Sequence, residues 1–89
     1  MRHRPTPPDP LVETIMHIVE AERASVDERL PHIARARYAL ATARAALAHA
    51  DEALRSMVTP AVAVMRVGIE QRRNALEKLA ARIDAIDLV

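Results

Sequence analysis

The sequence predicts an all-α fold built on an antiparallel helical hairpin, with an additional N-terminal helix that completes a three-helix bundle or joins a dimeric helical bundle. Apolar residues recur every three and four positions over long stretches, which is typical of helices packed along one face. The 89 residues contain a single glycine and no cysteine. Their richness in alanine, leucine and arginine is typical of long helices and coiled coils. We expect about 80% helix and no β-structure.

The length allows one small domain, over residues 10–89, preceded by a proline-rich tail over residues 1–9. The tail should be disordered, because its prolines prevent a helix and it offers little apolar surface to bury. Asp9 and Pro10 then fit the N-cap and first position of a helix. We expect helices over about residues 10–29, 31–58 and 60–87.

The first expected helix carries an apolar stripe that is interrupted by charge. Its members are spaced three, four and seven positions apart, which predicts the inner face of an amphipathic helix. Because this stripe is the one whose cover is undetermined, its residues are the candidate partner interface. They are Val12, Ile15, Val19, Glu22 and Val26.

The second and third expected helices carry heptad patterns. In the second, the a positions are Ile33, Leu40, Leu47 and Leu54, and the d positions are Ala36, Ala43, Ala50 and Met57. In the third, the stripe is Val62, Met65, Ile69, Arg72, Leu76, Leu79, Ile83 and Ile86. Alanines along a seam allow two helix axes to approach closely. These stripes predict a coiled-coil-like hairpin with an alanine-rich seam.

The register of the hairpin follows from its turn. When each a residue is paired with a d residue of an antiparallel partner, every pair is centred between Thr59 and Pro60. Threonine is a good N-cap and proline suits the first helical position, so local turn chemistry and long-range register agree. The register places Asp51 across from Arg66, within reach of an ion pair, and places Leu54 in the middle of the seam.

Pro31 allows two interpretations. It could be the first residue of a separate second helix, because an interior proline costs about 3 kcal/mol and restricts the residue before it. Alternatively, it could kink one long helix that runs from Pro10 to Val58. The kink is favoured by the unbroken heptad phase from Val12 to Leu40, which a loop need not preserve.

The sequence offers no chemistry that an enzyme would use, and we expect no catalytic residue, no cofactor and no metal site. The serines and threonines lack a glycine-rich elbow and a base at a fixed spacing. No two of the four histidines are three or four positions apart, and although Glu13 and His17 have a spacing of four, two ligands do not make a zinc site.

The net charge of +1 gives no general attraction for nucleic acid or anionic membrane. Residues 29–50 nevertheless contain arginines without an intervening acidic residue, and Arg35, Arg37 and Arg44 form a candidate nucleic-acid contact strip. No apolar run is long enough to span a membrane. The lack of cysteine fits a cytoplasmic setting, and 12 arginines against one lysine fit a GC-rich bacterial genome.

These observations favour a non-enzymatic protein–protein interaction module. We expect it to self-associate or to pack against another protein, because the hairpin helices also carry apolar residues away from their seam, among them Val58, Val64 and Val67. A small bacterial adaptor, an assembly subunit or a helical chaperone fits this description. The alternative is an accessory nucleic-acid-binding or regulatory protein that uses the Arg35–Arg44 strip.

Overall fold

The computed structural model describes residues 9–86. They form three helices, α1 (Pro10–Arg23), α2 (Val26–Leu54) and α3 (Pro60–Asp84), and no strand within this range. Helices account for 87% of the described residues, so the predicted all-α class is confirmed. The predicted tail, apart from Asp9, and the predicted end of the last helix at residue 87 lie outside the described residues.

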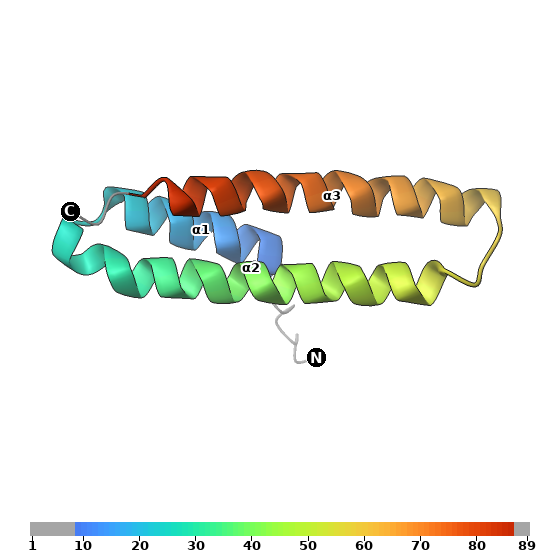
Figure 1. The fold of residues 1–89 in the computed structure, drawn as a ribbon, viewed down its shortest axis with the longest axis horizontal. Helices are drawn as coiled ribbons and strands as arrows, with labels where there is room; N and C mark the ends of the chain where they lie inside the picture. Colours follow the sequence, from blue (N-terminus) through green and yellow to red (C-terminus); the bar gives the residue numbers. More distant parts are fainter. Residues whose placement is uncertain (1–8, 87–89) are drawn as a thin grey trace, which may run out of the picture.

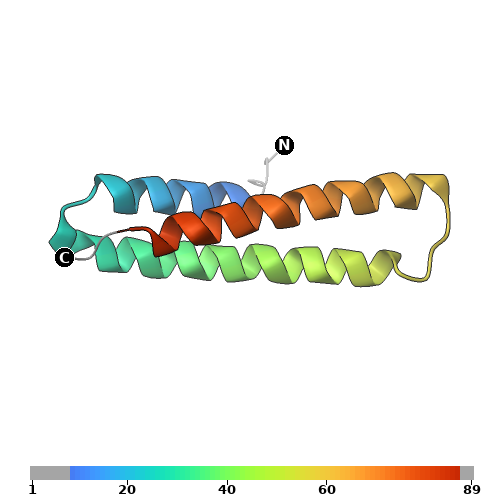
Figure 2. The same ribbon diagram turned by 45° about the horizontal axis from the view of Figure 1, so that its top comes forward.

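Helices α2 and α3 run in opposite directions side by side, and α1 lies against one face of this pair (Figures 1 and 2). The packing is that of a three-helix bundle, with α1 in closer contact with α2 than with α3. At 1.5 Å per residue, α1 is about 21 Å long, whereas α2 and α3 are about 43 and 37 Å long. Helix α1 therefore covers only the half of the pair where α2 begins. We call the part around residues 50–72 the distal half.

Two of the predicted helix starts are confirmed. Asp9 caps α1 by accepting a hydrogen bond from the backbone N–H of Leu11 at 3.0 Å. Thr59 caps α3 by accepting from the N–H of Val62 at 3.2 Å. Pro10 and Pro60 occupy the first positions of these helices, where the missing N–H has no helical partner to lose.

The boundary between α1 and α2 differs from both sequence interpretations of Pro31. The chain breaks at Ala24 and Ser25, whose ψ angles of 156° are extended, and Pro31 lies inside α2. The expected helices over 10–29 and 31–58 are therefore wrong at this junction. A single helix from Pro10 to Val58 is also wrong.

The local chemistry explains why the break precedes Pro31. Ser25 is a favoured N-cap residue, and Asp27 and Glu28 follow it in the first turn, where carboxylates stabilise the helix dipole. The carbonyl of Ala24 is satisfied by the Nε–H of Arg29 at 3.1 Å. Pro31 deprives α2 of one hydrogen bond, to the carbonyl of Asp27. Both residues are exposed, so water can reach that carbonyl.

The link between α2 and α3 is longer than predicted. Helix α2 ends at Leu54 instead of residue 58, and the chain reverses over residues 55–59. Two hydrogen bonds between residues three positions apart tighten the turn that follows α2, from Arg55 N–H to the Glu52 carbonyl and from Met57 N–H to the Leu54 carbonyl. Thr59 must be extended to cap α3, so the preceding residues have to complete the reversal.

The inner face of α1 is shifted by one residue from the predicted stripe. Its buried members are Thr14, Ile18 and Ala21, with Leu11 partly buried. Thr14 is fully buried because its hydroxyl donates to the carbonyl of Pro10 at 2.7 Å, which leaves its methyl group free to pack. The prediction that Val12, Ile15, Val19 and Val26 form the inner face is therefore wrong.

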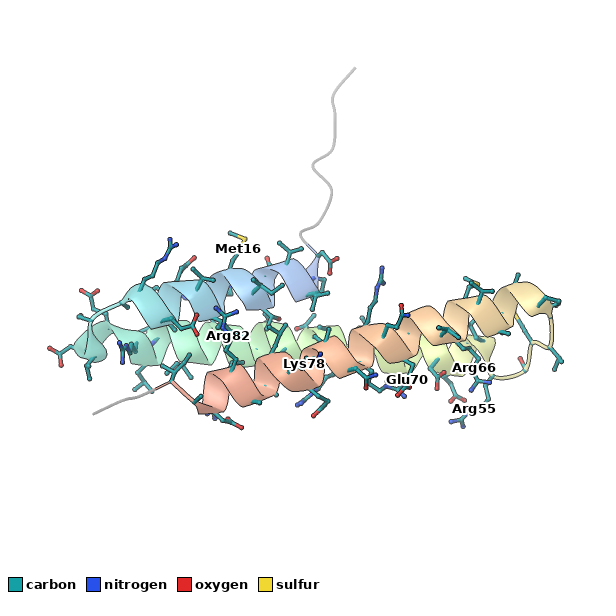
Figure 3. All side chains as sticks on the ribbon, turned by 90° about the horizontal axis from the view of Figure 1, so that it is seen from above. Met16, Arg55, Arg66, Glu70, Lys78 and Arg82 are labelled. Atoms are coloured by element: carbon teal, nitrogen blue, oxygen red, sulfur yellow. The ribbon has the colours of Figure 1, made fainter. Side chains whose placement is uncertain are left out.

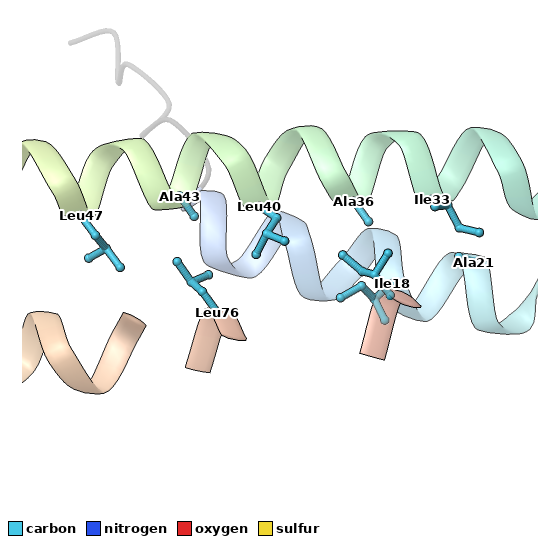
Figure 4. Close-up of a cluster of buried hydrophobic side chains, with 9 residues drawn as sticks. Ile18, Ala21, Ile33, Ala36, Leu40, Ala43, Leu47 and Leu76 are labelled. Atoms are coloured by element: carbon cyan, nitrogen blue, oxygen red, sulfur yellow. The ribbon is translucent and has the colours of Figure 1, made fainter. Parts of the chain in front are cut away.

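The hydrophobic core is concentrated where α1 meets α2 and α3 (Figure 4). Leu76 is 1% exposed at its centre, and the alanines of α2 let the helices approach it. In the distal half, by contrast, Leu54 is only partly buried and Met65 is 56% exposed. The expectation that Leu54 lies at the centre of the packed seam is not met.

This asymmetry predicts different costs for the same substitution. Leu76→Ala should lower the free energy of unfolding by about 2–5 kcal/mol, because it leaves a cavity in the core. Leu54→Ala should cost only about 1–2 kcal/mol, because its side chain is already partly in water. Urea unfolding of both variants measures the difference, and equal losses would contradict a core confined to the α1 end.

Candidate functional site

The distal half of the molecule contains an open apolar groove between α2 and α3. Its volume is about 510 Å³, and we call it the distal groove. Its lining residues are Ala50, Ala53, Leu54, Met65, Gly68, Ile69 and Arg72. A concave surface with one charged group among apolar ones has the composition of a binding site.

Small side chains create the groove. Ala50 and Ala53 line its α2 wall, and Gly68 lies on its α3 wall. A Cβ atom added at Gly68 would meet nothing within 4 Å, so the space in front of this glycine is open. Three such residues on two facing helices leave room for the close approach of another backbone.

The distal groove lies beyond the N-terminal end of α1. A smaller cavity of about 70 Å³ lies at the start of α1, where Pro10 and Leu11 approach Ala46 and Arg72. Arg72 borders both this cavity and the distal groove. The groove is therefore a continuation of the surface on which α1 packs, and the same face of the α2–α3 pair is covered in one half and open in the other.

Exposed apolar side chains surround this open half. They belong to the end of the α2–α3 pair that α1 does not reach, and Val58 is 95% exposed. The members are Met57, Val58, Val64, Met65 and Val67. Soluble monomers seldom expose apolar side chains in such a group unless the surface binds something.

The five predicted interface residues of the first helix region do not lie in this groove. Val12 is 50% exposed, Ile15 39% and Val26 41%, while Val19 is partly buried. With Met16, which points away from α2 and α3 (Figure 3), Val12 and Ile15 give α1 a second, outward apolar face. Three of the four apolar residues in the predicted interface are therefore exposed, although the stripe was expected to be the inner face of its helix.

Glu22, the charged member of that predicted set, has a different role. Its carboxylate accepts two hydrogen bonds from Arg82 of α3, one of them from Nε at 2.9 Å. Hydrogen bonding to Arg82 lowers the pKa of Glu22 below its usual value, and the same bond raises the pKa of Arg82. This pair links the C-terminal end of α1 to α3.

The candidate nucleic-acid strip is largely occupied by ion pairs with α3. Arg37 lies 3.6 Å from the carboxylate of Asp84, and Arg44 lies 3.1 Å from that of Glu77. Only Arg35 of the three predicted residues has no ion pair within residues 9–86. Arg37 and Arg44 therefore link α2 to α3 within the same chain.

The predicted pair of Asp51 and Arg66 is confirmed, with a separation of 3.5 Å. Asp51 also lies 3.9 Å from Arg73. The register that pairs Asp51 with Arg66 would also bring Arg44 level with Arg73, and in the structure each of these arginines lies near a carboxylate, Glu77 for Arg44 and Asp51 for Arg73. Exposed pairs of this kind are worth about 0–1 kcal/mol each, so they set orientation more than stability.

Two histidines meet at the α1–α2 contact. The Nδ1 atom of His32 lies 3.1 Å from the carboxylate of Glu20, without the alignment of a hydrogen bond, and that of His17 lies 4.0 Å from it. No group of three potential metal ligands occurs within residues 9–86. The Glu13–His17 pair weighed from the sequence gains no third ligand there.

The Glu22–Arg82 pair predicts a pH dependence. Because the pKa of Glu22 is lowered in the folded state, its contribution to stability is present above the unfolded pKa of about 4.3 and is lost as the pH falls through the lower folded value. Glu22→Gln should therefore unfold at a lower temperature than the parent protein at pH 7, and the difference should shrink below pH 4. A difference that stays constant from pH 7 to pH 3 would contradict this assignment. Glu52→Gln, at an exposed glutamate whose ion pair with Arg55 links no two helices, is the control and should melt close to the parent protein at both pH values.

No helix among the described residues has both the length and the apolar character needed to cross a membrane. Comparisons with protein-family models, curated proteins and solved structures found no match to this chain. The function is therefore argued from the geometry of the distal groove.

Proposed function

We propose that the protein is a non-enzymatic helical interaction module whose distal groove receives a helix of a protein partner. The observation that carries the proposal is the apolar groove that α1 leaves open next to an exposed group of valines and methionines. In this proposal, the α2–α3 pair acts as a coiled-coil-like hairpin with an alanine-rich seam. Its open half becomes part of a larger helical bundle when the partner binds.

A helix is the partner element that the groove suits best. The groove lies between the antiparallel α2 and α3, and α1 shows what kind of element packs on the adjoining part of the same face. Recognition of this kind places the apolar stripe of one helix into the groove between two others. Gly68 and the alanines allow a helix to approach closely, and Met65 can adapt its unbranched side chain to the partner.

The cellular role follows from this mode of binding. A module of 89 residues that binds helices and carries no chemistry of its own suits a small bacterial adaptor, an assembly subunit or a helical chaperone. The proposal includes a cytoplasmic setting, which the cysteine-free composition fits.

The nucleic-acid alternative is less well supported by the geometry. Phosphate binding requires arginines that can leave their present partners, but Arg37 and Arg44 are paired with Asp84 and Glu77. Those carboxylates lie beside the strip and would repel a phosphate backbone. No observation favours this function over protein binding.

Photo-cross-linking tests the proposal. The photoreactive amino acid benzoylphenylalanine is placed at position 65, in the wall of the distal groove, and the protein is produced in its native cells. Irradiation should yield a defined adduct, because Met65 is 56% exposed and would lie at the interface. An adduct of twice the chain mass identifies self-association, and any other defined mass identifies a different protein.

The matched control carries the same amino acid at position 34, where Ala34 is exposed on α2 outside the groove. This control should not give the adduct that forms from position 65. Equal yields from positions 65 and 34, or none from position 65, would contradict the proposed function.

A further inference from the structure

We infer that the occupant of the distal groove is α1 of a second copy of this chain, bound reciprocally in a two-fold symmetric dimer. Each copy would offer the outward face of its α1 to the partner's groove and receive the partner's α1 in its own. This inference rests on the proposed function and deepens it by naming the partner.

The part of the α2–α3 pair that α1 leaves uncovered is long enough to receive another helix. Helix α1 has 14 residues, about 21 Å, and its start lies near Ala46 and Arg72 on the α2–α3 pair. Beyond that level, about 13 Å of α2 and about 20 Å of α3 remain to the turn at residues 55–59. The uncovered part of the face is thus shorter than α1 along α2 and nearly as long as α1 along α3, so it accommodates most of one more α1.

Helix α1 is apolar on two faces. At 100° per residue, the inner face of Leu11, Thr14, Ile18 and Ala21 and the outward face of Val12, Ile15, Met16 and Val19 are centred about 130° apart. A helix that packs on one side only should be polar on the other. An α1 held between two α2–α3 pairs, its own and its partner's, needs both apolar faces.

The distal groove and the surface beneath α1 are continuous. The distal groove extends the surface on which α1 already packs, with Arg72 at the boundary. A two-fold axis near this boundary would place the partner's α1 end to end with the first, in one layer between the two α2–α3 pairs. Each copy then fills one groove and has one groove filled, so the assembly closes as a dimer and does not grow into a fibre.

The charges agree with this arrangement. Helix α1 carries three glutamates and one arginine, so it is net negative. Arg72 lines the groove and has no ion pair within the described residues, so it can meet a carboxylate of the incoming helix. The match in sign favours this helix over a basic one and makes association sensitive to salt.

Blocking the groove tests the inference by mass. Light scattering of the full chain at about 100 μM should give twice the chain mass for the parent protein and for Ala34→Lys, which places a lysine on the exposed surface of α2 outside the groove. Gly68→Lys should give the mass of one chain, because its long charged side chain fills the groove. Its melting temperature, measured at low concentration, should be unchanged or higher, since glycine is a poor helix former.

Disulfide trapping tests the geometry. The chain has no cysteine of its own, so Ile15→Cys and Ala53→Cys each introduce a single thiol. When the two variants are mixed and oxidised, they should form a mixed disulfide dimer, because the outward face of one α1 would lie against Ala53 of the other copy. Mixing Ile15→Cys with Ala34→Cys should give a much lower yield of mixed disulfide dimer, since Ala34 lies outside the groove.

The outcomes separate this inference from the proposed function. If the parent protein has the mass of one chain, the partner is not a second copy and the inference is overturned. A photo-adduct of position 65 with a different protein would still support the proposed function. The reciprocal arrangement is overturned if Gly68→Lys remains a dimer and the Ile15→Cys and Ala53→Cys variants form no mixed disulfide.

Discussion

Helix α1 has 14 residues, whereas α2 has 29 and α3 has 25, so the third member of the bundle reaches along only half of the face on which it packs. A pair of helices has one mutual seam and cannot bury apolar residues on its other faces without a third element. The core therefore forms where α1 is present. Where α1 is absent, the same face remains an open groove with apolar walls.

This constraint gives the two halves of the molecule different properties. At the α1 end, Leu76 is enclosed by three helices, and Glu22 and Arg82 hold the end of α1 to α3. In the distal half, Ala50 and Gly68 leave space that no side chain of the described chain fills. Stability and binding are thus assigned to separate parts of one short sequence.

The helices that begin with strong local signals could be predicted from the sequence. Thr59 and Pro60 act through their immediate neighbours, so the start of α3 was predictable, and the pairing of Asp51 with Arg66 followed from the same turn. The prediction for α2 failed because it placed the helix start from the steric cost of Pro31 and did not consider a start at Ser25. The spacing of Ser25 and Glu28 is that of a capping box and could have marked the start of α2, although Ser25 makes no side-chain cap bond there.

The candidate site was less predictable. The predicted inner stripe of α1 did not include Thr14 and lay one residue away from the observed inner face. The hydrogen bond from Thr14 to the Pro10 carbonyl explains why this residue can be buried. The distal groove was missed because its alanines and Gly68 are equally consistent with a tightly packed seam. Whether small residues bring helices together or leave a hollow depends on the length of the third helix, which the heptad pattern does not contain.

Hydrogen–deuterium exchange at low and high protein concentration tests the central claim, that α1 of a second copy covers the distal groove, most directly. The account predicts that concentration slows backbone exchange in two segments together, residues 12–19 of α1 and residues 62–72 of α3, and leaves residues 30–45 of α2 unchanged. Protection that is independent of concentration, or that increases along residues 30–45 instead, would contradict the account.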